Sequence, residues 1–177
     1  MSGGAAPGRL ARLFAPRALR WSLVELCRRT TLEGWEHLQA AEAAGRGVIL
    51  IASSGAPWPV AARALAAWAG PLHLALPDGA AGRRLARLAC AGDGAPRLAA
   101  EPAAVERALG EGGKVLVLAE PGARPPLVPP SIADDVPRLA ITVERPRRGR
   151  YRLVVGAAGA EAPPGALTAA GERPERG

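Results

Sequence analysis

Short apolar runs alternate with helix-like segments along residues 31–119, and this alternation constrains the fold more than any other feature of the sequence. The apolar runs have the length of buried strands and comprise VILIAS (48–53), LHLALP (72–77), the shorter PRLAA (96–100) and KVLVLAE (114–120). Helical patterns are found at 31–47, 59–70, 80–92 and 101–113. Because strands separated by helices form parallel sheets, we predict an α/β domain whose mostly parallel sheet is flanked by helices on both faces.

The expected helices carry residues that are typical of helix ends. Thr31 is the expected cap of a helix that ends in the turn Gly45 to Gly47, and Pro102 stands in the first turn of its helix. Hydrophobic residues make up 49% of the chain but aromatic residues only 3%. The core must therefore consist mainly of Ala, Leu and Val, and we expect its helices to pack closely.

The composition changes after residue 120. Residues 121–137 contain too many prolines for regular structure and are predicted to form a long loop. Two further strands are expected at 138–144 and 151–157, joined by the turn RPRRGR, which carries four arginines. The composition of residues 157–177 is typical of a disordered tail.

Residues 1–30 precede the domain predicted at 31–156 and are strongly basic. Between Arg9 and Arg29 there are six arginines and a single acid, Glu25, with leucines at roughly helical spacing. The segment is either a basic amphipathic element that lies on an anionic membrane, or a helix docked on the domain with a solvated basic face. Since no apolar run approaches the ~20 residues of a spanning helix, any membrane contact is expected to be peripheral. The expected location is the cytoplasmic face of an inner membrane, with the cytoplasm as the alternative.

Arginine carries nearly all of the positive charge, because Lys114 is the only lysine in a chain with a formal net charge of +7. This preference reflects either phosphate recognition by guanidinium groups or the GC-rich codons that Ala, Gly, Pro and Arg share. The arginines around the last hairpin are likewise either a solvated surface or phosphate ligands. Nucleic acid is not favoured as a partner, since aromatic stacking groups are scarce and no binding motif is present. Cys27 and Cys90 lack the spacing of metal ligands, and we expect reduced thiols, no metal and no cofactor.

The turn between the first buried strand and the next helix, residues 52–59, is the best candidate for a functional site by its position in such a fold. It offers hydroxyl, glycine and ring side chains from Ser53, Ser54, Gly55, Pro57, Trp58 and Pro59. The two serines are also typical N-cap residues, which is the alternative interpretation. A serine nucleophile needs a base, and the only histidines, His37 and His73, are expected on an early helix and in a strand. The sequence therefore does not support a serine triad.

A second turn, AEPGAR (119–124), follows another buried strand and combines Glu120, Gly122 and Arg124. It is either a cradle for a phosphate or a lipid headgroup, or an ordinary turn with a surface ion pair. In the first case the guanidinium group supplies the contact to the oxyanion.

One long stretch of the sequence resembles a known family. LEGWEHLQAAEAAGRGVILIASSGAPWPVAARALAAWAGPLHLAL, followed by AAVERALGEGGKVLVLAEPG and GRYRLVVGA, is similar to the bacterial acyltransferases that add secondary fatty chains to lipid A and related glycolipids. These enzymes belong to the lysophospholipid acyltransferase superfamily. The similarity covers residues 31–156 and is best over 32–76, with LEGWEHL and GRGVIL as its most specific part. The resemblance implies a glycerolipid acyltransferase-like α/β domain, truncated because this chain is much shorter than the usual family member.

The resemblance also implies where the family's catalytic residues belong. Members of the family follow the first strand with a histidine, four intervening residues and a carboxylate, usually as His-x-Gly-Asn-Trp-Glu. The histidine deprotonates the acceptor hydroxyl, which attacks an acyl thioester, and the acid orients the imidazole. Alignment on Trp58 places Ser54 at the histidine position and Pro59 at the carboxylate position. The resemblance thus implies a degenerate catalytic motif at Ser54 and Pro59, with Ser53, Gly55 and Trp58 as substrate-binding positions.

The turn AEPGAR is similar to the acceptor-binding turn Pro-Glu-Gly-Thr-Arg of the superfamily, with a proline inserted. The resemblance implies substrate-binding roles for Glu120, Gly122 and Arg124. Binding of an acceptor is compatible with this altered turn, whereas ordinary catalysis is not compatible with the loss of both residues of the dyad.

Three interpretations of the function follow. The first is an acyltransferase-like protein without catalysis that binds a lipid or an acyl donor, or modulates an active partner. The second is an active acyltransferase in which displaced groups, such as His73 or Glu120, replace the lost dyad. The third is a basic peripheral membrane module in which the sheet is only a scaffold. The expected partners are an anionic lipid or glycolipid, an acyl carrier protein or acyl-CoA, and a membrane surface.

Overall fold

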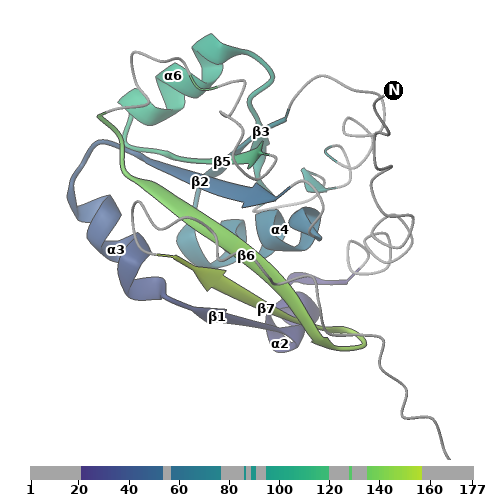
Figure 1. Cartoon of the computed structure of the whole chain (residues 1–177). Helices are drawn as coiled ribbons and strands as arrows, with labels where there is room; N and C mark the ends of the chain where they lie inside the picture. Colours follow the sequence, from purple (N-terminus) through teal and green to yellow (C-terminus); the bar gives the residue numbers. More distant parts are fainter. Residues whose placement is uncertain are drawn as a thin grey trace, which may run out of the picture.

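The computed structural model describes residues 21–53, 57–76, 86, 89–90, 95–119, 128 and 135–156. Within these residues there are seven strands: β1 (Thr30–Glu33), β2 (Val48–Ser53), β3 (Leu72–Ala75), β4 (Arg97–Leu98), β5 (Lys114–Ala119), β6 (Arg138–Arg147) and β7 (Arg150–Val155). Four helices have complete bounds: α2 (Leu23–Arg29), α3 (Trp35–Ala43), α4 (Trp58–Ala69) and α6 (Pro102–Gly110). Figure 1 shows the strands as one sheet, with α4 behind β2 and β6.

The sheet has the strand order β1-β7-β6-β2-β5-β3-β4. Strand β2 lies in the middle and is parallel to both of its neighbours, β5 and β6. The pair β6 and β7 is antiparallel, and the other neighbouring strands are parallel. The prediction of an α/β domain with a mostly parallel sheet flanked by helices is therefore confirmed.

Two hydrophobic cores lie on opposite faces of the sheet. The larger core joins the sheet to α2, α3 and α4, and Leu26, Leu38 and Leu65 are fully buried in it. The smaller core packs α6 against the other face through Val105 and Leu109. Residues of β2 and β5 alternate between the two cores, which is why both strands are apolar at almost every position. Full burial of a side chain such as Leu65 stabilises the fold by about 1.5–3 kcal/mol.

Helix α4 packs closely on the sheet, as the aromatic-poor composition predicts. Its buried residues include Ala61, Ala62, Ala64 and Ala66, and their small side chains let the helix backbone approach the strands. Ala86 and Ala89 are the buried residues described from the predicted helix at 80–92, and they belong to the same core.

The predicted helix at 31–47 begins later than expected, because residues 30–33 form the edge strand β1. Thr30 pairs with Tyr151 and Glu33 with Val154, so β1 runs parallel to β7. The prediction that Thr31 caps a helix is therefore wrong, since the backbone bonds to β7 and the β-branched side chains favour a strand here. Helix α3 instead follows Gly34, whose φ of 73° lies in the left-handed region.

Helix α2 docks on the domain, which agrees with one of the two interpretations of the basic N-terminal segment. Ser22 caps it by accepting a hydrogen bond from the backbone of Glu25 (3.2 Å), and Leu26 is fully buried in the larger core. The structured unit therefore includes residues before position 30. The other arginines of this segment, from Arg9 to Arg20, lie outside the described residues.

Strand β6 is longer than predicted and includes Pro146. Its pairing with β2 ends at Ile141, whereas its pairing with β7 continues to Arg147. Beyond Ile141 the strand is thus bonded on one side by the described strands, with a register shift between Glu144 and Arg147. Proline lacks an N–H donor and is tolerated at such an edge.

Over β6, β7 and β1, the face of the sheet opposite the larger core carries charged side chains. Arg152 of β7 donates hydrogen bonds to Glu33 of β1 (2.6 and 2.8 Å) and to Glu144 of β6 (3.1 Å), and all three side chains are partly exposed. Within the described residues no helix covers this part of the sheet. The expectation of helices on both faces therefore holds for the centre of the sheet and not for its β1 edge.

No helix among the described residues combines the length and the apolar character needed to cross a bilayer. The predicted tail at 157–177 and most of the predicted loop at 121–137 lie outside the described residues.

Candidate functional site

The two candidate turns leave neighbouring strands at the same edge of the sheet. Ser53, the last residue of β2, pairs with Ala119, the last residue of β5. Ser54 and Glu120 come next in the sequence, and both lie outside the described residues. The parallel register therefore brings the starts of the two turns side by side, as expected for the carboxyl ends of parallel strands. Three further candidates also lie outside the described residues, namely Gly55, Gly122 and Arg124.

Trp58 and Pro59 form the first turn of α4 at this edge, and both are buried. The Trp58 side chain is only 5% exposed and belongs to the larger core. Burial of this ring anchors the start of α4 to the sheet. The rings of Trp58 and Pro59 are therefore buried packing groups at the start of α4.

The start of α4 is poorly equipped to bind an anion through its backbone. Its N-cap is Pro57, with no side-chain hydrogen bond, so the alternative that Ser53 or Ser54 caps this helix is wrong. Pro59 has no N–H group, and the N–H of Val60 donates to the carbonyl oxygen of Pro57 (3.0 Å). These residues leave fewer free amides than the first turn of a helix usually presents.

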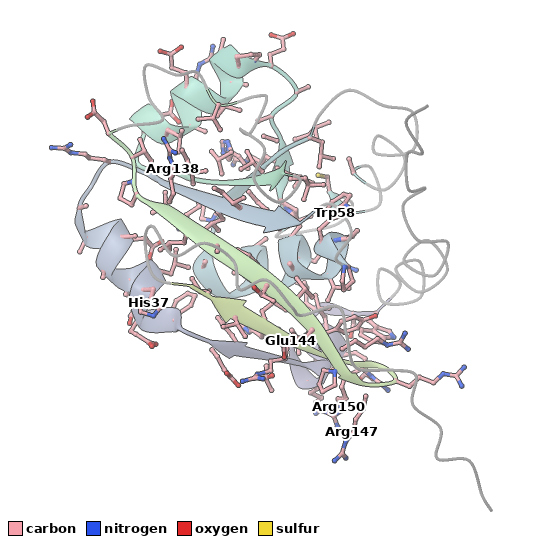
Figure 2. All side chains as sticks on the ribbon, viewed as in Figure 1. His37, Trp58, Arg138, Glu144, Arg147 and Arg150 are labelled. Carbon is pink, nitrogen blue, oxygen red and sulfur yellow. The ribbon has the colours of Figure 1, made fainter. Side chains whose placement is uncertain are left out.

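Neither histidine of the chain lies at the candidate site. His73 pairs with Val115 on β5, four residues before Ala119, which is the partner of Ser53. Four residues of strand correspond to roughly 13 Å along the sheet. His37 lies on α3, far from Trp58, as Figure 2 shows. Neither histidine therefore lies at the carboxyl end of β2.

The environment of His73 favours its neutral form. Burial is the main cause that lowers the pKa of His73, and the positive charge of Arg97 lowers it further. Glu111 opposes both with a smaller effect. The His73 imidazole is thus biased toward its neutral form, and its place in β3 is four residues before the level of Ser53 and Ala119.

Arginines from two distant parts of the sequence meet at another corner of the domain. Arg150 of β7 donates a hydrogen bond from Nη1 to the backbone carbonyl of Arg28 in α2 (2.6 Å). Arg29 pairs with Glu25 and places its guanidinium group 5.0 Å from the ring centre of Trp21. We call this surface the arginine corner and define it as Arg28, Arg29, Arg145, Arg147, Arg148 and Arg150.

Sequence reasoning identified the arginines of the hairpin and of the N-terminal segment separately, and missed that they form one surface. Arg28 and Arg150, one from each group, are 122 residues apart in the sequence. The pairing of β1 with β7 brings them together, and the sequence signal that could have revealed it is the short β-branched stretch Thr30–Glu33.

A shallow apolar groove lies next to the arginine corner. It runs between α2 and α4 and is lined by Leu23, Val24, Cys27, Arg28, Ala66 and Ala67. Val24 is 63% exposed, which is unusual for a large aliphatic side chain in this domain. Arg28 belongs to both the groove and the arginine corner, so the two surfaces are continuous.

Within the described part of the chain, no group of three or more His, Cys, Asp or Glu side chains is placed to hold a metal ion. Cys27 and Cys90 are free, half-buried thiols. A comparison of the sequence with models of known protein families and with curated proteins finds no match.

Proposed function

We propose that this chain is a non-catalytic acyltransferase-like protein that binds a lipid or an acyl donor at the carboxyl ends of β2 and β5. Its expected place is the cytoplasmic face of a bacterial inner membrane. The observation that carries the proposal is the pairing of Ser53 with Ala119. The two turns to which the resemblance assigns catalysis and acceptor binding thereby start from neighbouring strands at one edge of the sheet.

Neither histidine of the chain lies at the carboxyl ends of β2 and β5, and this supports a binding role. Acyl transfer from a thioester needs a group that takes the proton from the acceptor hydroxyl, and general-base catalysis typically contributes about 10²- to 10⁴-fold. The serine hydroxyl at position 54 is too weakly basic for this near pH 7, and Pro59 has no ionisable group. His73 lies roughly 13 Å away along the sheet, which counts against its use as a displaced base.

Acyl-transfer and binding assays with one set of proteins test the proposal. The wild-type chain and the Ser54→His, Pro59→Glu double variant are incubated with labelled acyl carrier protein or acyl-CoA and with lysolipid or glycolipid acceptors. A Ser54→Gln, Pro59→Gln double variant is the matched control, because it changes the same positions and adds no base. Binding of donors and acceptors to the wild-type chain is measured in parallel by calorimetry.

We expect binding without turnover by the wild type, turnover by the His/Glu variant, and none by the Gln/Gln control. Turnover by the wild type above that of the Gln/Gln control would overturn the non-catalytic assignment. In that case His73→Gln tests the displaced histidine directly. A folded wild-type chain that binds neither donors nor acceptors would overturn the binding role.

A further inference from the structure

The arginine corner presents an excess of positive charge on two elements that pack together. The β6–β7 hairpin contributes the exposed Arg147 and Arg148, which stand at the turn between the strands. Figure 2 shows Arg147 and Arg150 together at this end of the sheet. Of the acidic side chains nearby, Glu25 is paired with Arg29, and Glu144 is paired with Arg152. The exposed guanidinium groups at the turn are therefore available to an anionic partner.

Apolar surface borders this charge on the same helix. Val24 and Arg28 are four residues apart in α2 and thus lie on one helix face. Both line the groove against Ala66 and Ala67 of α4. A partner that covers the arginine corner and the groove together must offer anionic groups beside apolar groups.

We propose that the arginine corner and the adjoining groove form a docking face for an anionic phospholipid surface. The arginines contact lipid phosphates, and Val24 enters the boundary between headgroups and acyl chains. A bilayer combines these two chemistries, and a helix with a basic and an apolar side lies in its interface in this way. This inference does not depend on the proposed function, because Trp58 and the β2–β5 edge lie apart from Arg147 and Arg150 (Figure 2).

The described surface fits a lipid better than a nucleic acid. Proteins that bind single-stranded nucleic acid stack bases on exposed aromatic rings. At the arginine corner, Trp21 packs edge-on against Tyr151 at 5.9 Å between ring centres and lies under Arg29, and Tyr151 is buried. A nucleic acid would also leave the exposed Val24 without an apolar partner.

Vesicle co-sedimentation of the full chain tests this docking face. The probes are vesicles of phosphatidylcholine alone and vesicles that contain phosphatidylglycerol, at low and at high salt. The test variant is Arg147→Gln, Arg148→Gln, and the matched control is Arg46→Gln, Arg107→Gln. The control removes the same charge from two arginines that are also exposed and lie outside the arginine corner. A third variant, Val24→Ser, removes the apolar contact without changing the charge.

We expect the wild type to bind the anionic vesicles, and high salt to weaken the binding. An arginine near an anionic membrane contributes about 1 kcal/mol, or roughly fivefold in affinity, so the hairpin variant is expected to bind roughly 30-fold more weakly. The control is expected to stay within about twofold of the wild type, since the membrane field falls off within a Debye length. Val24→Ser is expected to weaken binding several-fold.

Three results would overturn the inference. The first is the absence of binding to anionic vesicles at low salt. The second is an equal loss in the hairpin variant and the control, which would mean that only net charge matters. The third is tighter binding of an RNA or DNA oligonucleotide than of vesicles at equal phosphate concentration, with the same dependence on Arg147 and Arg148. None of these results bears on acyl-donor binding at the β2–β5 edge.

Discussion

Replacing Gly34 by alanine is expected to cost far more folding free energy than the same change at Gly45, although the two backbones are almost the same. Their φ angles are 73° and 69°, both in the left-handed region. An L-residue in this region costs about 1–2 kcal/mol relative to glycine, and this cost applies to both positions. The difference between the two variants must therefore come from what the new methyl group meets.

The surroundings of the two glycines differ sharply. A Cβ atom on Gly34 would stand 2.1 Å from the carbonyl oxygen of Val155, whereas a Cβ atom on Gly45 meets nothing within 4 Å. An ordinary carbon-to-oxygen contact is about 3.3 Å, so the end of β7 must move by about an ångström. Overpacking of this kind costs about 1–3 kcal/mol. The expected totals are about 2–5 kcal/mol for Gly34→Ala and about 1–2 kcal/mol for Gly45→Ala.

Urea unfolding followed by tryptophan fluorescence measures this difference. The chain has four tryptophans, and the change in the midpoint at constant slope gives the free-energy loss. Hydrogen exchange of β1 and β7 is expected to rise in Gly34→Ala and to stay unchanged in Gly45→Ala. Equal losses of stability in the two variants would refute the contact between Gly34 and β7, and with it the placement of β1 beside β7.

His73 is expected to make the free energy of unfolding depend on pH. Burial and the charge of Arg97 lower its pKa below the ordinary 6.5, and Glu111 opposes them with a smaller effect. The unfolded chain therefore binds the proton more tightly than the folded chain. The free energy of unfolding should therefore fall as the pH drops through about 6.5 and level off below the pKa of His73 in the folded chain. Urea unfolding at a series of pH values measures this, and the same pH dependence in His73→Gln would contradict the reasoning. Lys114 is 11% exposed in its side chain and its Nζ lies 2.5 Å from Oε1 of Glu42. Glu42→Gln is expected to cost about 1–3 kcal/mol by leaving this charge unpaired, and Lys114→Met added to it should recover most of the loss in thermal unfolding; no recovery would count against the ion pair.

The buried strands were predictable because their signal is local. Strands β2 and β5 are six-residue runs that are apolar on both faces, and runs this short between helical patterns predict buried strands. Strand β1 has four residues, and its only strand partner in the described sheet comes about 120 residues later. A threonine in front of a helical pattern is equally typical of a cap, so the sequence alone could not separate the two structures.

The candidate site was predictable for the same reason and only to the same extent. The rule that parallel strands share a carboxyl edge predicts that Ser53 and the end of β5 lie on one side of the sheet. Their direct pairing depends on the strand order, which follows from tertiary packing and not from local pattern. The arginine corner was missed because it needs the pairing of Thr30 with Tyr151, and the short stretch Thr30–Glu33 indicates a strand without identifying its distant partner.

The position of β1 has a consequence for the order of folding during synthesis. Thr31 and Tyr151 are separated by 120 residues, and a ribosome adds about 5–20 residues per second, so roughly 6–24 s pass before β7 exists. During this time α3 and β2 can form their local contacts, whereas β1 cannot pair because β7 has not been made. The outermost strand at this side of the finished sheet is thus among the first to be made, but it cannot pair until the last strand has been made.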